Sequence, residues 1–121
     1  MNKILATVAL AATCFGVTPA HAADQQWTFM GVGTETCAQF AREYMKNPEQ
    51  TDLVFFSWAQ GYMSAINDFI SPKKVLNSMP TFEQRVRVHD YCQQHPSDRY
   101  AQAIPPLLDS FPDATNKADK Q

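Results

Sequence analysis

The chain has 121 residues, of which 12 are acidic and 10 are basic, so its formal net charge at neutral pH is −2. This length predicts a single domain with a modest hydrophobic core. The charge balance is weakly acidic and no basic run is longer than Lys73-Lys74, so the positive footprint of a nucleic-acid-binding protein is missing and we expect no nucleic-acid partner.

The N-terminus is typical of a secretory signal. Lys3 precedes an apolar stretch over residues 4–17, and the small-residue pattern Ala20-x-Ala22 then marks a cleavage site for signal peptidase. The apolar stretch is shorter than the roughly 20 residues that a membrane-spanning helix needs, and no later stretch is long and apolar enough to span. We therefore expect residues 1–22 to be removed and the rest to reach the periplasm as a soluble protein, without membrane insertion.

A short extended arm is expected over residues 27–33, ahead of the first helix. Trp27 and Phe29 lie two positions apart and would share one face of an extended chain. This arrangement makes both side chains candidates for contacts with a partner.

The first helix is predicted to begin at Thr36. Thr36 and Gln39 fit a capping box, in which each side chain accepts a hydrogen bond from the backbone N–H group of the other residue. The helix is expected to end at Asn47-Pro48, because the residue before a proline avoids the helical conformation.

The second helix is predicted to run from Asp52, a suitable N-cap residue, to about Ile70. Its apolar residues form a wide stripe, which indicates contact with more than one neighbouring element. Gly61 lies in the middle, where glycine weakens a helix by up to about 1 kcal/mol relative to alanine, so we expect another backbone to approach closely there. The stripe consists of Phe55, Trp58, Ala59, Tyr62, Met63, Ile66, Phe69 and Ile70.

The third helix is predicted to start at Thr81, which forms a second capping-box pattern with Gln84, and to end at His95 before a proline. A fourth segment with helical spacing follows from about Ser97, and Pro105-Pro106 should kink it or start a second short helix. The sequence thus predicts an all-α fold, a small domain of four to five helices over residues 23–112. A loose polar tail is expected over residues 113–121.

Two cysteines, Cys37 and Cys92, remain after removal of the signal. In an oxidising compartment an isolated pair is expected to form a disulfide, which would tie the first helix to the third. The chain-entropy model assigns roughly 4 kcal/mol to a loop of this length. Redox-active pairs usually have Cys-x-x-Cys spacing, so we interpret this pair as structural.

The sequence contains no constellation typical of an enzyme. His89 and His95 are six positions apart, which is not a helical metal-ligand spacing, and no glycine-rich phosphate loop or nucleophile elbow occurs. We therefore expect no catalytic residue, no metal and no cofactor.

The aromatic residues are the richer signal, because they are too many for the core of a four-helix domain to bury them all. The surplus is expected to form a surface that binds unfolded proteins or a specific protein partner, or the face of a homodimer. The candidates are Trp27, Phe29, Phe55, Trp58 and Tyr62.

Three segments resemble the HdeA/HdeB family of periplasmic acid-stress chaperones. They are Thr36-Cys37-x-x-Phe40, Trp58-Ala-Gln-Gly-Tyr62 and Tyr91-Cys92-Gln-Gln-His-Pro96. The resemblance implies a small exported helical protein with a single disulfide, dimeric at neutral pH. In acid such a protein comes apart, exposes apolar surface and keeps unfolding proteins in solution. Protonation of most carboxylates at about pH 2–3 would leave this chain strongly positive and favour such loosening.

A second resemblance competes with the first. The segment from Trp58 to Asn67, His95-Pro96 and the stretch from Ala101 to Pro112 are similar to small helical immunity proteins of type VI secretion systems. This resemblance implies a protein that binds and neutralises a toxin in the periplasm. Many of those proteins have an additional cysteine pair, which this chain lacks.

Overall fold

The computed structural model describes residues 30–115, and the predicted signal sequence and the start of the predicted arm lie outside this range. The elements are η1 (Gly31–Thr34), α1 (Cys37–Lys46), α2 (Pro48–Phe69), η2 (Leu76–Ser78), α3 (Thr81–Gln94), η3 (Tyr100–Ala103) and α4 (Ile104–Asp109), where η denotes a 3-10 helix. There is no β-strand within the described residues, and the predicted all-α class is confirmed.

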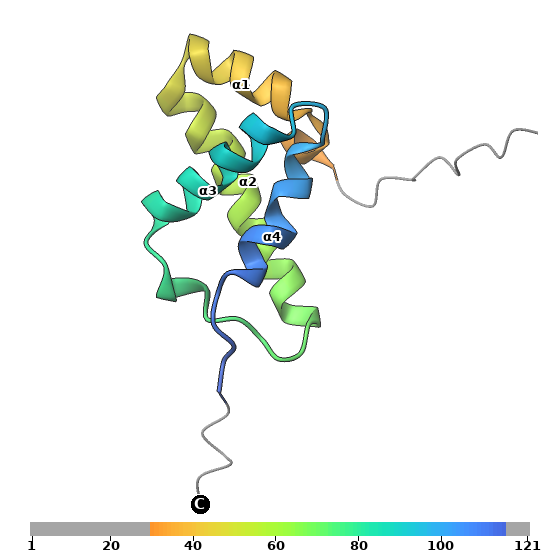
Figure 1. Ribbon diagram of the computed structural model, residues 1–121, viewed down its shortest axis with the longest axis vertical. Helices are drawn as coiled ribbons and strands as arrows, with labels where there is room; N and C mark the ends of the chain where they lie inside the picture. Colours follow the sequence, from red (N-terminus) through yellow and green to blue (C-terminus); the bar gives the residue numbers. More distant parts are fainter. Residues whose placement is uncertain (1–29, 116–121) are drawn as a thin grey trace, which may run out of the picture.

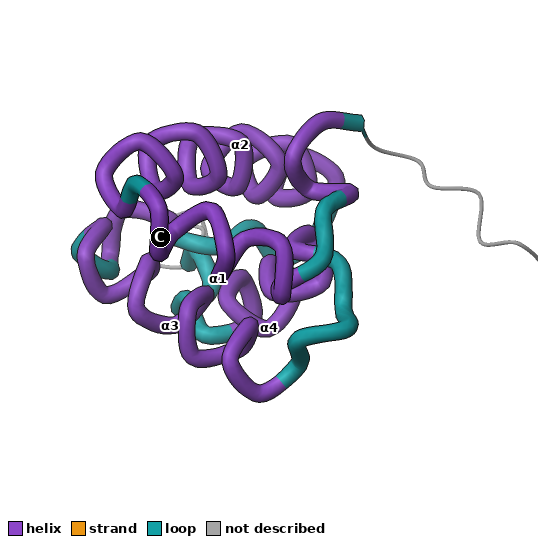
Figure 2. Tube along the Cα trace, turned by 90° about the horizontal axis from the view of Figure 1, so that it is seen from above, coloured by secondary structure: helices purple, strands orange, loops and turns teal. Residues whose placement is uncertain are grey.

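The long helix α2 is the central element of the domain. In Figure 1 it runs through the length of the molecule, and in Figure 2 it lies along one side with α1, α3 and α4 on the other. Its inward face contributes Phe55, Phe56, Ala59 and Met63 to the core. The remaining large core residues come from the other helices, from η3 and from the segment after α4, and they include Phe40, Val88, Tyr100, Ile104, Leu107, Leu108 and Phe111.

The predicted disulfide is confirmed. The Sγ atoms of Cys37 and Cys92 are 2.08 Å apart and the two Cα atoms 4.8 Å apart, so the first residue of α1 is fixed to the last turn of α3. The loop after α3 adds two backbone hydrogen bonds, because the N–H groups of Cys37 and Ala38 donate to the carbonyls of Asp98 at 2.8 Å and Pro96 at 2.9 Å. These bonds satisfy N–H groups that a helix N-terminus otherwise leaves free.

Of the predicted extended arm, residues 27–29 lie outside the described range, and residues 31–33 are not extended. Gly31–Thr34 forms the turn η1, and Gly31 has a φ of 83°, which glycine adopts without a steric penalty. Gly33 is buried, and a Cβ atom added there would overlap the indole ring of Trp58. The backbone approach expected at Gly61 does not occur among the described residues: Gly61 is exposed and an added Cβ would meet nothing within 4 Å.

The boundary between α1 and α2 is shorter than predicted. The capping box at Thr36 is confirmed, with the Gln39 N–H donating to Thr36 Oγ1 at 3.1 Å and the Thr36 N–H to Gln39 Oε1 at 2.8 Å. Asn47, however, both ends α1 and caps α2, since its Oδ1 accepts from the Gln50 N–H at 3.2 Å. Pro48 occupies the first turn of α2, where its missing N–H group has no consequence. The prediction that α2 begins at Asp52 was therefore wrong.

The predicted capping box at Thr81 is not formed. The N-cap residue is Pro80, which has no side-chain hydrogen bond. Gln84 is buried and its Nε2 donates to the carbonyl of Met79 at 2.7 Å. The side-chain amide of Gln84, which was expected to cap the helix, instead bonds to the loop that precedes α3. The predicted end of α3 at His95 is confirmed.

The fourth helix differs at its start. Residues 97–99 are not helical, η3 follows, and α4 begins only at Ile104. Pro105 and Pro106 lie in the first turn of α4, where proline is tolerated. Of the two predicted outcomes, a new short helix is the one that occurs.

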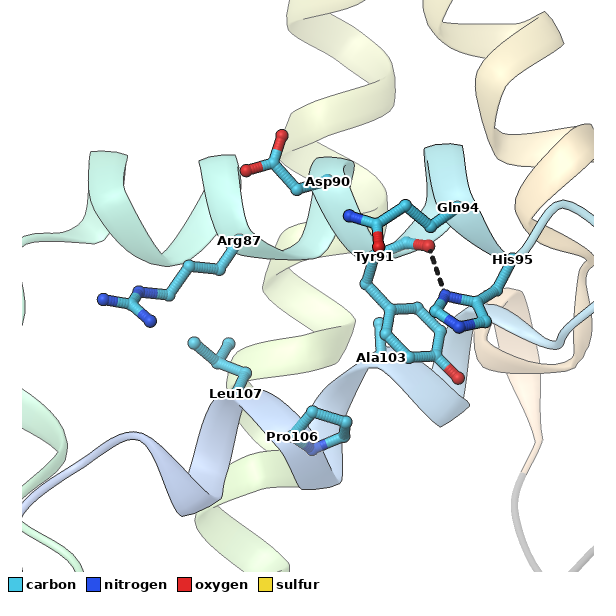
Figure 3. A pocket seen from close by; sticks show the side chains of 8 residues that line it. All are labelled: Arg87, Asp90, Tyr91, Gln94, His95, Ala103, Pro106 and Leu107. Atoms are coloured by element: carbon cyan, nitrogen blue, oxygen red, sulfur yellow. Dashed lines mark hydrogen bonds between the residues drawn. The ribbon is translucent and has the colours of Figure 1, made fainter.

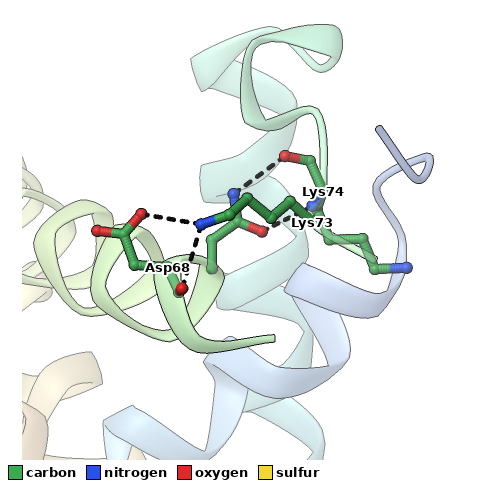
Figure 4. A network of polar contacts seen from close by, with 4 residues as sticks. Asp68, Lys73 and Lys74 are labelled. Atoms are coloured by element: carbon green, nitrogen blue, oxygen red, sulfur yellow. Dashed lines mark hydrogen bonds and ion pairs between the residues drawn. The ribbon is translucent and has the colours of Figure 1, made fainter. Parts of the chain in front are cut away.

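Part of the predicted polar tail belongs to the fold. The Val75 N–H donates to the carbonyl of Pro112 at 2.9 Å, and Ala114 is paired with Lys73 in the same way at 2.6 Å. The Nζ of Lys74 also lies 2.6 Å from a carboxylate oxygen of Asp113. Next to these contacts, Lys73 reaches Asp68 at the end of α2 (Figure 4). Residues 116–121 of the predicted tail lie outside the described range.

Candidate functional site

The predicted binding residues do not form one exposed surface. Phe55 is only 6% exposed and belongs to the core, so in the folded state it cannot contact a partner; this part of the prediction is corrected. Trp58 and Tyr62 of α2 are partly buried and pack against the core. Trp27 and Phe29 lie outside the described residues.

Trp58 and Tyr62 hold the N-terminal turn against α2. Their rings stack with centroids 4.9 Å apart, and the indole N–H of Trp58 donates to the carbonyl of Met30 at 2.9 Å. The same ring covers Gly33. In the folded state both side chains therefore serve to dock η1, which explains why an aromatic pair lies at this place on α2.

A polar pair joins α2 to α3 beneath aromatic rings. The Nε2 of His89 lies 3.0 Å from Oδ1 of Asp52, with side-chain exposures of 25% and 21%. The imidazole is enclosed by Phe40 and Tyr44 of α1, whose ring centroids are 4.8 and 4.6 Å away. Sequence analysis missed this pair, because it assigned Asp52 to a helix cap and found no partner for His89.

A groove lies at the junction of α1, α2 and α3, and we call it the Arg85 groove. Its volume is about 290 Å³. Phe82 and Val86 on its rim are large apolar side chains that are 77% and 39% exposed. Both residues belong to α3, and their exposure shows that they face away from the core. The groove is lined by Tyr44, Asp52, Phe82, Arg85, Val86, His89 and Asp90.

Arg85 also approaches the core. Its guanidinium carbon lies 5.3 Å from the centroid of the buried Phe56 ring, a cation–π contact. Its charge and that of Asp52 act on the buried hydroxyl of Tyr100: burial raises the pKa of Tyr100, Asp52 raises it further and Arg85 lowers it. The two charges thus flank the same core residue from the groove side.

A second groove, of about 270 Å³, separates α3 from α4 (Figure 3). Tyr91 and His95 stack along it with ring centroids 4.2 Å apart. The Tyr91 hydroxyl donates to Oδ2 of Asp98 at 2.7 Å. Burial, the hydrogen bond to Asp98 and the charge of Asp98 together raise the pKa of Tyr91 to about 12. The hydroxyl is therefore neutral at physiological pH and fastens the loop after α3.

Two further observations bear on the possible classes of site. Within residues 30–115, no group of three or more His, Cys, Asp and Glu side chains is placed to hold a metal ion. None of the described helices is long and apolar enough to cross a membrane.

Comparison of the chain with protein-family models, with curated proteins and with solved structures finds no match.

Proposed function

We propose that the exported chain, residues 23–121, is a periplasmic helical protein that binds unfolding proteins in acid, as the resemblance to the HdeA/HdeB family implies. The observation that supports this function is that three polar contacts between separate elements each depend on an aspartate. Asp52 of α2 contacts His89 of α3. Asp98, in the loop after α3, accepts a hydrogen bond from Tyr91. Asp113, in the C-terminal segment, pairs with Lys74.

Acid acts on all three contacts at once. At about pH 2–3 carboxylates in proteins are largely protonated, which weakens charge-assisted contacts, while lysine and arginine side chains stay positive. The positive charges then repel each other and favour an expanded state. The bond between Cys37 and Cys92 does not titrate and keeps α1 joined to α3. The result is a loosened but tethered chain in which Phe55, Trp58 and Tyr62 become available to clients.

The direct test is a client-protection assay. Residues 23–121, oxidised, are mixed with an aggregation-prone protein at about pH 2–3, the mixture is neutralised, and light scattering is recorded. We expect strong suppression after acid treatment and none when the mixture is kept at pH 7. Equal protection at both pH values, or none in acid, would remove this function.

Asparagine variants test the role of the aspartates. Asp52→Asn and Asp113→Asn each weaken one contact permanently, so we expect protection to begin at a higher pH than in the unmodified protein. Asp109→Asn is the matched control, because Asp109 is exposed at the end of α4 and has no contact of this kind among the described residues. An identical shift in all three variants would show that only net charge matters.

The alternative function is that of an immunity-type protein, which binds one toxin while folded. The observation that favours it is the preformed Arg85 groove with Phe82 and Val86 exposed at its rim at neutral pH. A toxin encoded beside this gene that binds the folded protein at pH 7, with loss of binding in Phe82→Ala, would favour this alternative over acid-dependent client binding.

A further inference from the structure

Within residues 30–115, Arg85 is a charged residue without a charged partner. Among the described residues it takes part in no ion pair, and its Nε is buried with no hydrogen-bond acceptor. Its neighbour on the same helix behaves in the ordinary way: Arg87 pairs with Glu83 at 2.8 Å, in an i, i+4 arrangement on the surface. Two arginines two positions apart thus have opposite surroundings.

The isolation of Arg85 is energetically unfavourable. Buried donors in native proteins almost always have acceptors, and leaving one without an acceptor destabilises the folded state. The guanidinium is nevertheless held in place by the ring of Phe56. Exceptions of this kind are expected where a side chain serves binding rather than stability.

The remaining charges of the groove do not neutralise Arg85. Asp52 already faces His89 at 3.0 Å. Asp90 is exposed to solvent, and no ion pair joins it to another described residue. The open side of the guanidinium therefore faces a groove with an apolar rim, a place where one carboxylate and one apolar group would fit together.

We propose that the Arg85 groove binds the C-terminal residue of a partner polypeptide, with the terminal carboxylate paired to Arg85 and the apolar side chain against Phe82 and Val86. A volume of about 290 Å³ is at the lower limit for drug-sized ligands, and it matches one residue better than a longer segment. A chain terminus also supplies a carboxylate and an apolar side chain in a single residue.

This binding goes beyond the acid-dependent function. It uses the folded state at neutral pH, whereas client holding uses the loosened state, so either activity can fail without the other.

The test is a titration of the exported, oxidised chain at pH 7, followed by ¹H–¹⁵N NMR. The probe is an acetylated tetrapeptide of three alanines and a C-terminal leucine, prepared as the free acid and as the amide. We expect the free acid to shift the resonances of Phe82, Arg85 and Val86, and the amide to bind about tenfold more weakly, because it lacks the charge-assisted pair. Equal binding of the two peptides, or no shifts at these residues at millimolar peptide, would overturn the proposal.

Variants of the two arginines assign the effect. Arg85→Ala should abolish the preference for the free acid, and Arg85→Lys should keep part of it, because lysine retains the charge but not the paired donors. Arg87→Ala should leave the preference unchanged. If circular dichroism shows that Arg85→Ala is unfolded, the proposal is tested by Arg85→Lys and by the binding of the two peptides to the unmodified protein. Octanoate that binds as tightly as the free acid would overturn the assignment to a polypeptide.

Discussion

The two ends of the domain are held together by different kinds of interaction. The disulfide end, which comprises η1, α1, the start of α2, the end of α3 and η3, combines the Cys37–Cys92 bond with interlocked rings such as Phe40 and Tyr100, 5.0 Å apart between centroids. The far end comprises the end of α2, the segment 70–80 and residues 112–114, and it lies at the opposite side of the molecule in Figure 1.

Polar contacts dominate the far end. Asn67 forms a reciprocal pair with the backbone of Lys74, at 2.7 and 3.0 Å, and Lys74 then reaches Asp113. Such contacts are partly exposed and individually weak, whereas a disulfide and a buried aromatic cluster resist both acid and local opening. The comparison indicates that the far end opens first and that the disulfide end is the last to unfold.

Removal of the disulfide should have the largest effect on the difference in stability between the two ends. In the double variant Cys37→Ser and Cys92→Ser, we expect the free energy of unfolding to fall by about 2–4 kcal/mol, since a loop spanning 55 positions is no longer closed in the unfolded chain. Urea denaturation measures the loss. Hydrogen exchange should show the amides of α1 losing protection until they resemble those of the far end.

The outcome that contradicts this expectation is also clear. Unchanged stability in the double variant would mean that the aromatic cluster alone holds α1. A loss of protection confined to the far end would mean that the disulfide stabilises that end rather than α1. Asp109→Asn, an exposed substitution at the end of α4, serves as a neutral control for both measurements.

Local patterns explain which predictions succeeded. The capping box at Thr36 was predictable because both partners lie within one helical turn, and the disulfide followed from counting cysteines. The same box failed at Thr81, because the amide of Gln84 is drawn to the carbonyl of Met79 in the preceding loop. Tertiary competition of this kind leaves no local trace in the sequence.

The candidate site was less predictable than the fold. Asp52 and His89 are 37 positions apart, and their meeting depends on how α3 crosses α2. The Arg85 groove depends on the same crossing, so neither Arg85 nor the exposure of Phe82 could be predicted from helical periodicity. Periodicity identified the aromatic residues of α2, but not that Phe55 is buried while Trp58 covers a glycine.

Glycine substitutions test how tightly the disulfide end is packed. In Gly33→Ala the new Cβ would overlap the indole of Trp58, so we expect a loss of about 1–3 kcal/mol, the usual consequence of overpacking. Gly61→Ala is the matched substitution on open surface, and it should stabilise the protein by up to about 1 kcal/mol through helix propensity. Thermal unfolding of both variants measures whether each substitution raises or lowers the stability of the protein.

The contrast between the two variants is the informative result. If Gly33→Ala is neutral, Trp58 moves aside easily, and η1 is held more loosely than the rest of the disulfide end. If Gly61→Ala is destabilising, the exposed face of α2 has a contact beyond the described residues.

The smallest effect expected concerns a hydrogen bond beside the disulfide. The pKa of Tyr91 is about 12 in the folded protein, against about 10 for an unperturbed tyrosine. Between these values the unfolded chain has lost the hydroxyl proton while the folded chain keeps it. The contribution of Tyr91 to stability is therefore present below pH 10 and is lost as the pH rises toward 12.

Tyr91→Phe should remove this part of the alkaline pH dependence and lower stability slightly at pH 7, because the bond to Asp98 is lost. Urea midpoints between pH 8 and 11 measure both effects. Tyr44→Phe is the control, since no hydrogen bond to the Tyr44 hydroxyl is formed among the described residues. An equally steep alkaline loss in Tyr91→Phe would assign the titration to the buried hydroxyl of Tyr100 alone. In that case alkaline pH would destabilise the core of the disulfide end and not the loop that is held by Tyr91.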